Sequence, residues 1–374
     1  VVGSSTATNF VITNGGQVGI STTTFSTSSE KFSVVGNISN ITNSNNLPIS
    51  VGAISTGAGA RSVFVSGRYA YVVNDGTDTL QIFNISKPNS PVSVGTVSTG
   101  SDPNYVFVSG RYAYVVNYTS ATLQIFDVSN PKSPVLKGSA VTGANPINVF
   151  VSGNYAYTTN IGSDTLQIFD ISNPGVPVSV SSISTGLDPY SVYVSGRYAY
   201  TANRAAATLK IFDISNPSLP VSVGSVGTGA DPRYVYVSGQ YAYIVNITAS
   251  TLQIFDISNP SLPVSVGSVS GSAPMYSVFV SGRYAYATSY DNGTMQVFDV
   301  LNPSSPVFLG SVSSGAGTLS VFVSGRYAYT ASYTAATLRI FDIQGIETTS
   351  AIVHSLEAGN LQVRNDITAQ GQLS

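Results

Sequence analysis

Charged residues recur at fixed places along this chain, and they are the first to test for chemistry. An Asp closes the same apolar run in most repeats: Asp127, Asp170, Asp213, Asp256, Asp299 and Asp342, with Asn84 in the first. An Arg follows a Gly at Arg68, Arg111, Arg197, Arg283 and Arg326, with Asn154 and Gln240 in the other repeats. A ring of carboxylates could hold a metal ion. Because each Asp is expected beside an Arg-bearing turn, we favour ion pairs and turn hydrogen bonds that fix strand register.

Residues for catalysis are scarce. The chain has one His, His354, and no Cys, which leaves no array of imidazole or thiolate ligands and no Ser-His-Asp arrangement within the repeats. Walker A, GxGxxG, EF-hand and GxSxG motifs do not occur in the sequence. We therefore expect no enzyme, no catalytic residues, no cofactor and no bound metal.

The elements that must position these residues follow from a repeat. The pattern VSGxYAY begins at Val65 and returns every 43 residues, at Val108, Val151, Val194, Val237, Val280 and Val323. Each period contains four short β-prone runs separated by Gly, Pro and Asn, as in Tyr105–Ser109, Tyr112–Asn117, Thr122–Val128 and Val135–Val141. Four strands per repeat of this length predict the blade of a β-propeller, an all-β fold with seven blades.

Packing between the blades can be read from the YAY triplet. Tyr occupies both ends in all seven repeats and Ala the centre, as in Tyr69, Ala70 and Tyr71. Successive strand residues face opposite ways, so a bulky face is set against a small one and neighbouring blades can interlock. The Gly before the triplet, Gly67 in the first repeat, is expected at positive φ in a turn.

The ends of the repeat array predict how the ring closes. The fourth strand, PVSVGSVSTG in the middle repeats, occurs before the first full repeat as residues 48–57 and is missing after the last. We expect the N-terminal strand to complete the last blade, which leaves no free sheet edge. The predicted organisation is an N-terminal β arm at 1–46, a propeller at 47–344 and a C-terminal β arm at 345–374, with both arms leaving the rim side by side.

The repeats differ mainly on the face opposite the Gly-Arg turns, in the loops between strands two and three and at the start of each blade. Residues there that break the repeat are our candidates for binding, because rigid scaffolds carry function on loops. They are Tyr118, Tyr190, Arg204, Arg233, Tyr276, Tyr290 and Tyr333. Neutral drift among solvated loops is the alternative. Asp102, Asp188 and Asp231, each before Pro, and Asn145 before Pro146 indicate turns, with cation binding as the alternative.

The arms are too apolar and β-prone for disordered linkers. Phe10–Ile20 predicts a hairpin about Asn14-Gly15. Segments this short rarely stabilise themselves, so we expect strand addition with arms or propellers of other copies, and folding back onto their own propeller is the alternative. The candidate assembly residues are Phe10, Val11, Ile12, Phe32, Val34, Val35, Ile38, Leu361, Val363 and Ile367.

Charge excludes some partners. The net charge is −2 and charged residues make up 9% of the chain, so no basic surface favours nucleic acid. No apolar run reaches the roughly 20 residues that a membrane helix needs. We interpret the chain as part of a longer exported protein. Six Asn-x-Ser/Thr sequons permit glycosylation: Asn37, Asn40, Asn84, Asn117, Asn246 and Asn292.

Two repeat families resemble these strands. Leu123–Asp127 (LQIFD) resembles the LVIVD repeat, with Gln and Phe in place of both Val, and Tyr71–Asn74 (YVVN) is similar to the YVTN repeat of surface-layer propellers. The resemblance covers about 300 residues and implies an exported β-propeller without shared catalytic residues. Asn14–Thr24 and Gly359–Leu373 look like stalk segments of phage tail-fibre-like and bacterial surface proteins, which implies a self-associating, fibrous context.

The leading functional hypothesis is a non-enzymatic extracellular structural protein, whose propellers assemble through the terminal arms into a fibre, appendage or surface layer. The alternative is an adhesin, or a module that binds glycans or proteins through the variable loop face. The expected partners are accordingly other copies of the chain, with surface glycans or proteins in the second case.

Overall fold

The computed structural model describes residues 10–12, 18–20 and 47–343. The chain forms two units, Val1–Thr42 and Asn43–Ser374. In the first unit, β1 (Phe10–Ile12) pairs antiparallel with β2 (Val18–Ile20), so the predicted hairpin is confirmed. The other proposed assembly residues and His354 lie outside the described residues.

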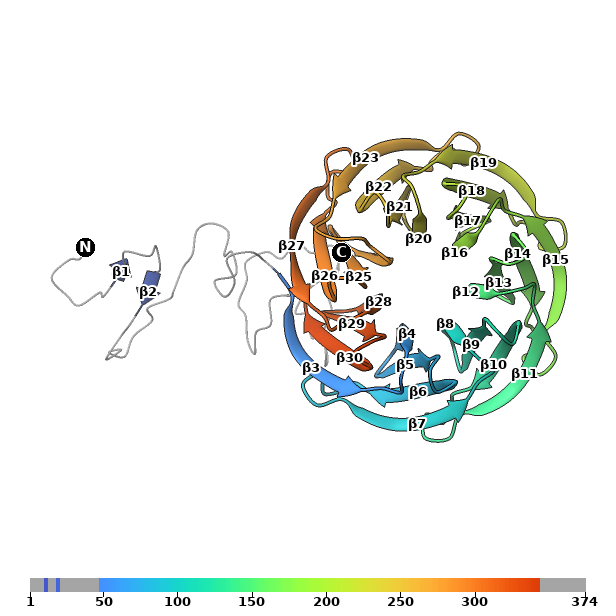
Figure 1. Cartoon of the computed structure of the whole chain (residues 1–374), viewed down its shortest axis with the longest axis horizontal. Coiled ribbons are helices and arrows are strands. Elements are labelled where there is room, and N and C mark those ends of the chain that lie inside the picture. Colours follow the sequence, from blue (N-terminus) through green and yellow to red (C-terminus); the bar gives the residue numbers. More distant parts are fainter. Residues whose placement is uncertain (1–9, 13–17, 21–46, 344–374) are drawn as a thin grey trace, which may run out of the picture. The chain divides into compact units, whose positions relative to one another are not determined.

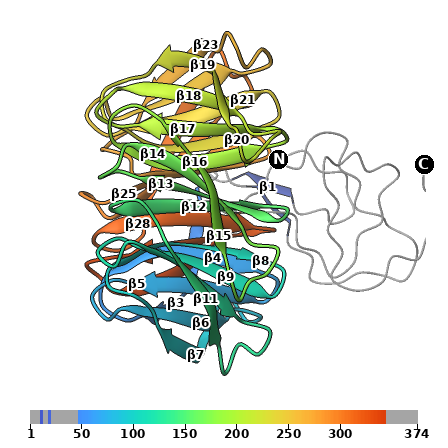
Figure 2. The ribbon, with the colours of Figure 1, turned by 90° about the vertical axis from the view of Figure 1, so that its right-hand side faces the viewer.

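The second unit contains seven four-stranded antiparallel sheets arranged in a ring (Figure 1), which confirms the predicted seven-bladed propeller. The first strands, nearest the channel, are β4 (Ala60–Ser66), β8 (Pro103–Ser109), β12 (Pro146–Ser152), β16 (Pro189–Ser195), β20 (Pro232–Ser238), β24 (Ser277–Ser281) and β28 (Thr318–Ser324). The second strands are β5 (Tyr69–Asn74), β9 (Tyr112–Asn117), β13 (Tyr155–Asn160), β17 (Tyr198–Asn203), β21 (Tyr241–Asn246), β25 (Tyr284–Ser289) and β29 (Tyr327–Ser332). Seen from the side, the first and second strands run through the thickness of the disc (Figure 2).

The outer half of each blade follows the same order. The third strands are β6 (Thr79–Asn84), β10 (Thr122–Asp127), β14 (Thr165–Asp170), β18 (Thr208–Asp213), β22 (Thr251–Asp256), β26 (Thr294–Asp299) and β30 (Thr337–Asp342). The fourth strands are β7 (Val92–Ser98), β11 (Val135–Val141), β15 (Val178–Ser184), β19 (Val221–Gly227), β23 (Val264–Ser270), β27 (Val307–Ser313) and β3 (Ile49–Ser55). We number the blades one to seven, beginning with β4–β7.

Blade seven is the only one built from both ends of the repeat array. Its strand order is β28-β29-β30-β3, and Ile49 lies opposite Asp342. The predicted closure by residues 48–57 is therefore correct. Every blade then has the same four strands, and the first and last blades meet without an unpaired inner edge.

The core lies between blades, as the YAY triplet predicts. The seven central Ala residues have no exposed surface, and the second Tyr of each triplet is buried. Ala70 of blade one shares a core cluster with Tyr329 of blade seven, and Ala113 of blade two shares one with Tyr71 of blade one. One Phe per blade, such as Phe169, is also fully buried. Burying such a side chain stabilises the fold by roughly 1.5–3 kcal/mol.

One face of the disc, which we call the turn face, carries the Gly-Arg turns and is nearly the same in every blade. The Gly preceding each YAY triplet has φ between 56° and 58°, as expected. The predicted ion pairs form in four blades: Arg111–Asp127, Arg197–Asp213, Arg283–Asp299 and Arg326–Asp342. In blade one, where Asn84 replaces Asp, Arg68 Nε donates to the hydroxyl of Tyr69 at 3.1 Å. In these five blades the Arg side chain therefore contacts a partner within its own blade.

Two of the predicted glycosylation sequons are unsuited to modification in the folded chain. Asn117 and Asn246 have no exposed surface, and the Nδ2 of each donates to a Thr Oγ1 at 3.0–3.1 Å. Their side chains close the ends of second strands. Asn292, in contrast, lies in an exposed loop.

A candidate ligand-binding cup on the loop face

The opposite face, which we call the loop face, holds a cup at the mouth of the central channel. One residue at the start of each blade forms its rim: Arg61, Asn104, Ile147, Tyr190, Arg233, Tyr276 and Leu319. In every blade except the sixth, this residue is skipped in the pairing of the first two strands, as at Arg61 between Ala60 and Ser62. Such a bulge re-aims a side chain, which explains how this row turns to the mouth. The cup encloses about 70 Å³, several times the roughly 10–15 Å³ that one water needs.

The floor of the cup is a bridge between blades two and five. The hydroxyls of Tyr105 and Tyr234 hydrogen-bond to each other across the channel, with ring centroids 6.3 Å apart. Burial raises the pKa of both phenols, so both stay neutral over a wide pH range. At the same repeat position, Ser191 Oγ accepts a hydrogen bond from the backbone N–H of Val235 in the next blade at 2.9 Å. This row therefore ties neighbouring blades together.

A closed belt of aromatic rings lies two residues beyond the floor position along the first strands. Neighbouring ring centroids are 4.5–5.0 Å apart all the way round. The members are Phe64, Phe107, Phe150, Tyr193, Tyr236, Phe279 and Phe322. Tilted rings at these distances attract one another, so the belt holds the inner strands together beneath the cup.

Six of the seven predicted binding residues lie in one arc along the loop face. The ring of Tyr276 lies 5.7 Å from that of Tyr290, which lies 6.3 Å from that of Tyr333. At one end, the guanidinium of Arg61 lies 5.5 Å from the ring of Tyr333. At the other, Arg233 lies between the rim positions of Tyr190 and Tyr276, and Arg204 lies 5.6 Å from the Tyr190 ring. We call this set, with Arg61, the aromatic arc.

Tyr118 is the exception among the predicted binding residues. It follows β9 on the same face and is half-buried, but its ring takes no part in the aromatic arc. The six members are likewise half-buried rather than exposed, because they cover one another.

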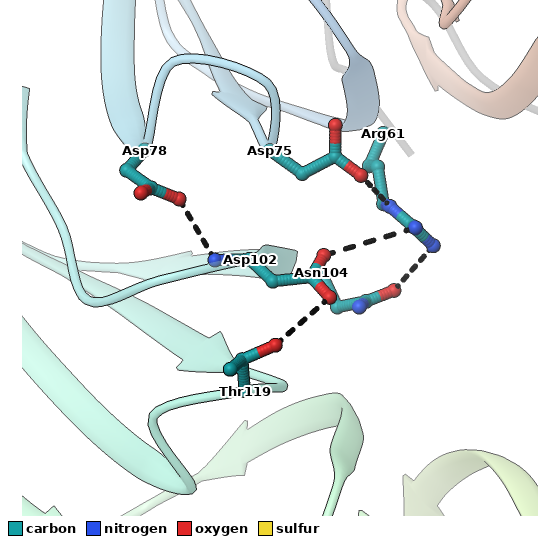
Figure 3. Close-up of polar contacts among 6 residues, drawn as sticks. All are labelled: Arg61, Asp75, Asp78, Asp102, Asn104 and Thr119. Atoms are coloured by element: carbon teal, nitrogen blue, oxygen red, sulfur yellow. Dashed lines mark hydrogen bonds and ion pairs between the residues drawn. The ribbon is translucent and has the colours of Figure 1, made fainter.

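Carboxylates beside the cup hold two arginines of the aromatic arc, Arg61 (Figure 3) and Arg204. Arg61 Nε donates to Asp75 Oδ2 at 2.5 Å, Nη1 donates to Asn104 Oδ1 at 3.1 Å, and Nη2 lies 3.7 Å from Asp102 Oδ1. Desolvation raises the pKa of Asp75 despite this cation. Arg204 similarly contacts Asp188 at 2.9 Å and Asp231 at 3.6 Å. The Asx-Pro acids thus bind Arg side chains.

Their backbone fits a turn. Asp102, Asn145, Asp188 and Asp231 have φ between 56° and 63°, the left-handed region that Asp and Asn tolerate best. Among the described residues, no cluster of three or more His, Cys, Asp or Glu side chains is placed to hold a metal ion. The cup offers aromatic faces, amides, hydroxyls and guanidinium groups, which suit reversible binding by stacking and hydrogen bonds.

Sequence reasoning missed the floor and the belt. Tyr105 and Tyr234 replace a small polar residue at the position next to the variable rim residue, so the same comparison of repeats could have found them. Arg61 and Asn104 also lie at the variable start of a blade and are not among the seven predicted binding residues. Every repeat carries a Phe or Tyr at the belt position, so a search for residues that break the repeat does not select it.

Comparison with known proteins decides the family. The LVIVD repeat matches seven segments: 57–99, 102–142, 145–185, 188–228, 230–271, 273–314 and 316–350. The chain belongs to the LVIVD repeat family. Each matched segment of this LVIVD propeller begins near the start of a first strand and runs to the end of a fourth, except that the last is completed by β3. The substitutions of Gln and Phe in the third strand therefore leave the family pattern intact.

Solved structures share the fold at low sequence identity. The β-propeller domain of Cps50 (Swd1) from Myceliophteria thermophila has a TM-score of 0.67 and 11% identity, covering 79% of this chain and 100% of that domain. Hydrazine synthase from Kuenenia stuttgartiensis has a TM-score of 0.64 and 15% identity, covering 77% and 97%. A putative 6-phosphogluconolactonase from Bacteroides fragilis has a TM-score of 0.59 and 15% identity, covering 67% and 86%. At these identities the likeness shows the fold alone.

No curated protein matches the LVIVD propeller in sequence. Within the described residues, no helix is long and apolar enough to span a bilayer.

Proposed function

We propose that this LVIVD propeller is a non-enzymatic recognition protein of the cell surface that binds glycans at the cup and the aromatic arc. The observation that carries the proposal is the meeting of six repeat-breaking residues in one chain of contacts beside a cavity. Drift among independent loops has no reason to bring such residues together. The low charge, the serine- and threonine-rich composition and the family resemblance support an extracellular location.

The side chains of the cup suit sugars. A pyranose ring has an apolar face that stacks on an aromatic ring, and hydroxyls that need planar hydrogen-bonding groups. Tyr276, Tyr290 and Tyr333 supply a row of rings, and Asn104 and Asn148 supply amides at the cup. The bound sugar would replace water on half-buried rings without any rearrangement of the blades.

Binding is tested with an array of neutral and acidic glycans, followed by calorimetry on each ligand found. Tyr290→Ala should weaken binding at least tenfold because it removes the central ring of the arc. Tyr118→Ala is the matched control, since Tyr118 lies on the same face outside the arc. An array without ligands, or equal losses in both variants, would count against the proposal.

Self-assembly is the second candidate function, and the outer edge of the disc favours it. The first residue of the fourth strand is apolar and 43–55% exposed in every blade: Ile49, Val92, Val135, Val178, Val221, Val264 and Val307. The adjoining turns add Val176, Leu219, Leu262 and Leu301 at 64–69% exposure. The chain enters and leaves blade seven at this same edge, where Ile49 lies opposite Asp342. Other copies of the chain are the proposed occupants.

Electron microscopy of the purified protein tests assembly. Filaments or sheets should form with the full chain and should be lost when residues 1–46 and 345–374 are removed. Single discs at high concentration with the arms intact would contradict it. Assembly through the outer edge of the disc leaves the loop face free, so the two functions are compatible in one molecule.

A further inference from the structure

The three arginines of the loop face differ in what neutralises them. Arg61 has two carboxylates within 4.0 Å, those of Asp75 and Asp102, and Arg204 has those of Asp188 and Asp231. Among the described residues, no carboxylate lies within 4.0 Å of Arg233, and no side chain or backbone oxygen accepts a hydrogen bond from it. Within the described part of the chain, Arg233 is therefore a cation at the cup without a direct ion pair, although Asp231 attracts it from beyond that distance.

Aromatic rings take the place of a direct ion pair. The Arg233 guanidinium lies 3.7 Å from the centroid of the Tyr190 ring and 5.2 Å from that of Tyr276. Stacking on a ring uses the flat face of the guanidinium and leaves the five N–H groups at its edge unused. Burial lowers the pKa of Arg233, which shows that its surroundings solvate the charge less well than water does. An anion that bound at this edge would meet little competition from protein acceptors.

The charge of the cup lining suits an anionic ligand. Arg61 and Arg233 are its charged residues, and the rest of the described lining is Asn, Tyr, Ser, Ile and Leu, without Asp or Glu. The carboxylates that hold Arg61 and Arg204 lie outside the cup. Its space of about 70 Å³ suits a small anionic group, with the rest of a ligand above it.

We propose that the Arg233 guanidinium receives the carboxylate of an acidic sugar, such as a uronic acid, whose ring then stacks along Tyr276 and Tyr290. This inference rests on the proposed glycan-binding function and names its ligand class. A planar carboxylate matches the guanidinium fork with two parallel hydrogen bonds, which neutral hydroxyls do not reproduce. Tyr190 and Tyr276 hold the guanidinium in place before the ligand arrives, so little side-chain entropy is lost on binding.

Calorimetry with trigalacturonic acid and its methyl ester tests the inference, because esterification removes the carboxylate charges and otherwise adds only small methyl groups. The acid should bind the wild-type protein at least tenfold more tightly than the ester. Arg233→Asn should abolish this preference, and the substitution is compatible with the fold because Asn104 occupies the same position in blade two. Arg111→Gln on the turn face is the matched control, with Gln240 as its precedent, and should keep the preference.

The outcomes separate the two proposals. Equal binding of acid and ester would overturn the carboxylate site and leave glycan binding standing. A preference that survives in Arg233→Asn would overturn the role of Arg233. If neither these sugars nor the glycan array shows binding, but a short peptide with a free C-terminal carboxylate binds and its amide does not, the glycan proposal is wrong and the acidic-sugar inference falls with it.

Discussion

The two faces of the disc are built from the same repeat but follow different rules. On the turn face, blades two, four, six and seven form the same Arg–Asp pair at the same turn. On the loop face, no two neighbouring blades present the same rim residue, and contacts run from one blade to the next. The ion pairs of the turn face stabilise only the blade that contains them. The contacts of the loop face join different blades into one candidate site. In this molecule, departure from the repeat is the better guide to the proposed site.

The largest effect is expected from the buried second Tyr of the YAY triplets, which belongs to the core between the blades. Burial raises the pKa of Tyr114, Tyr157, Tyr200 and Tyr329 to about 12, while an unfolded Tyr ionises near 10. Their stabilisation is complete below pH 10 and is lost as pH rises towards 12, by up to about 1.4 kcal/mol per pH unit for each Tyr. Denaturant unfolding at rising pH, followed with tyrosinate absorbance, measures this loss. Ionisation of all tyrosines near pH 10 without unfolding would contradict it.

The next largest effect is a difference in unfolding free energy between a core variant and a variant of the candidate site. Phe169→Ala leaves a cavity at a fully buried position and should lower the free energy of unfolding by about 3–5 kcal/mol. Tyr290→Ala removes a half-buried ring on the loop face and should cost about 1 kcal/mol or less. Equilibrium denaturation of both variants checks the difference. Similar losses would mean that the aromatic arc is part of the core.

A moderate effect is expected at the floor of the cup. Tyr105→Phe leaves the Tyr234 hydroxyl without its partner and should cost about 1–3 kcal/mol, whereas the double change to Phe should cost less than either single one. A double-mutant cycle on unfolding free energies measures the coupling. Additive losses would show that the bridge between blades two and five does not form.

The smallest effect is expected on the turn face. Arg197 holds the pKa of Asp213 at about 2, below its usual value near 4, so the pair stabilises the fold above about pH 4 and less as pH falls towards 2. Arg197 is exposed and Asp213 only half-buried, so solvent screens the pair and Arg197→Gln should lower the unfolding midpoint at neutral pH only slightly. NMR titration should show the Asp213 pKa return towards 4. A large loss of stability would mean that the turn face does more than fix register.

The regular parts of the molecule could be predicted from the sequence. The 43-residue period predicted the blades, the YAY triplet predicted their interlocking, and the displaced fourth strand predicted ring closure. Each depends on side-chain alternation along a strand, which is a local property. Six of the arc residues could be found as departures from the repeat.

The geometry of the site could not be predicted in the same way. In every blade except the sixth, a bulge shifts the strand register by one residue at Arg61 or its equivalent, so alternation no longer tells which way the side chain points. The hydrogen bond between Tyr105 and Tyr234 joins residues 129 positions apart, and only the closed ring brings them together. The lack of a direct ion pair at Arg233 among the described residues depends on where every neighbouring carboxylate lies.

One triple variant tests most directly whether the departures from the repeat make the site. Tyr190, Arg233 and Tyr276 are all changed to Asn, the residue that blade two carries at this position, and unfolding and binding to the best array ligand are measured on the same sample. The account predicts a folded propeller with nearly the wild-type unfolding midpoint and no detectable binding. Binding that persists, or a propeller that no longer folds, would contradict it.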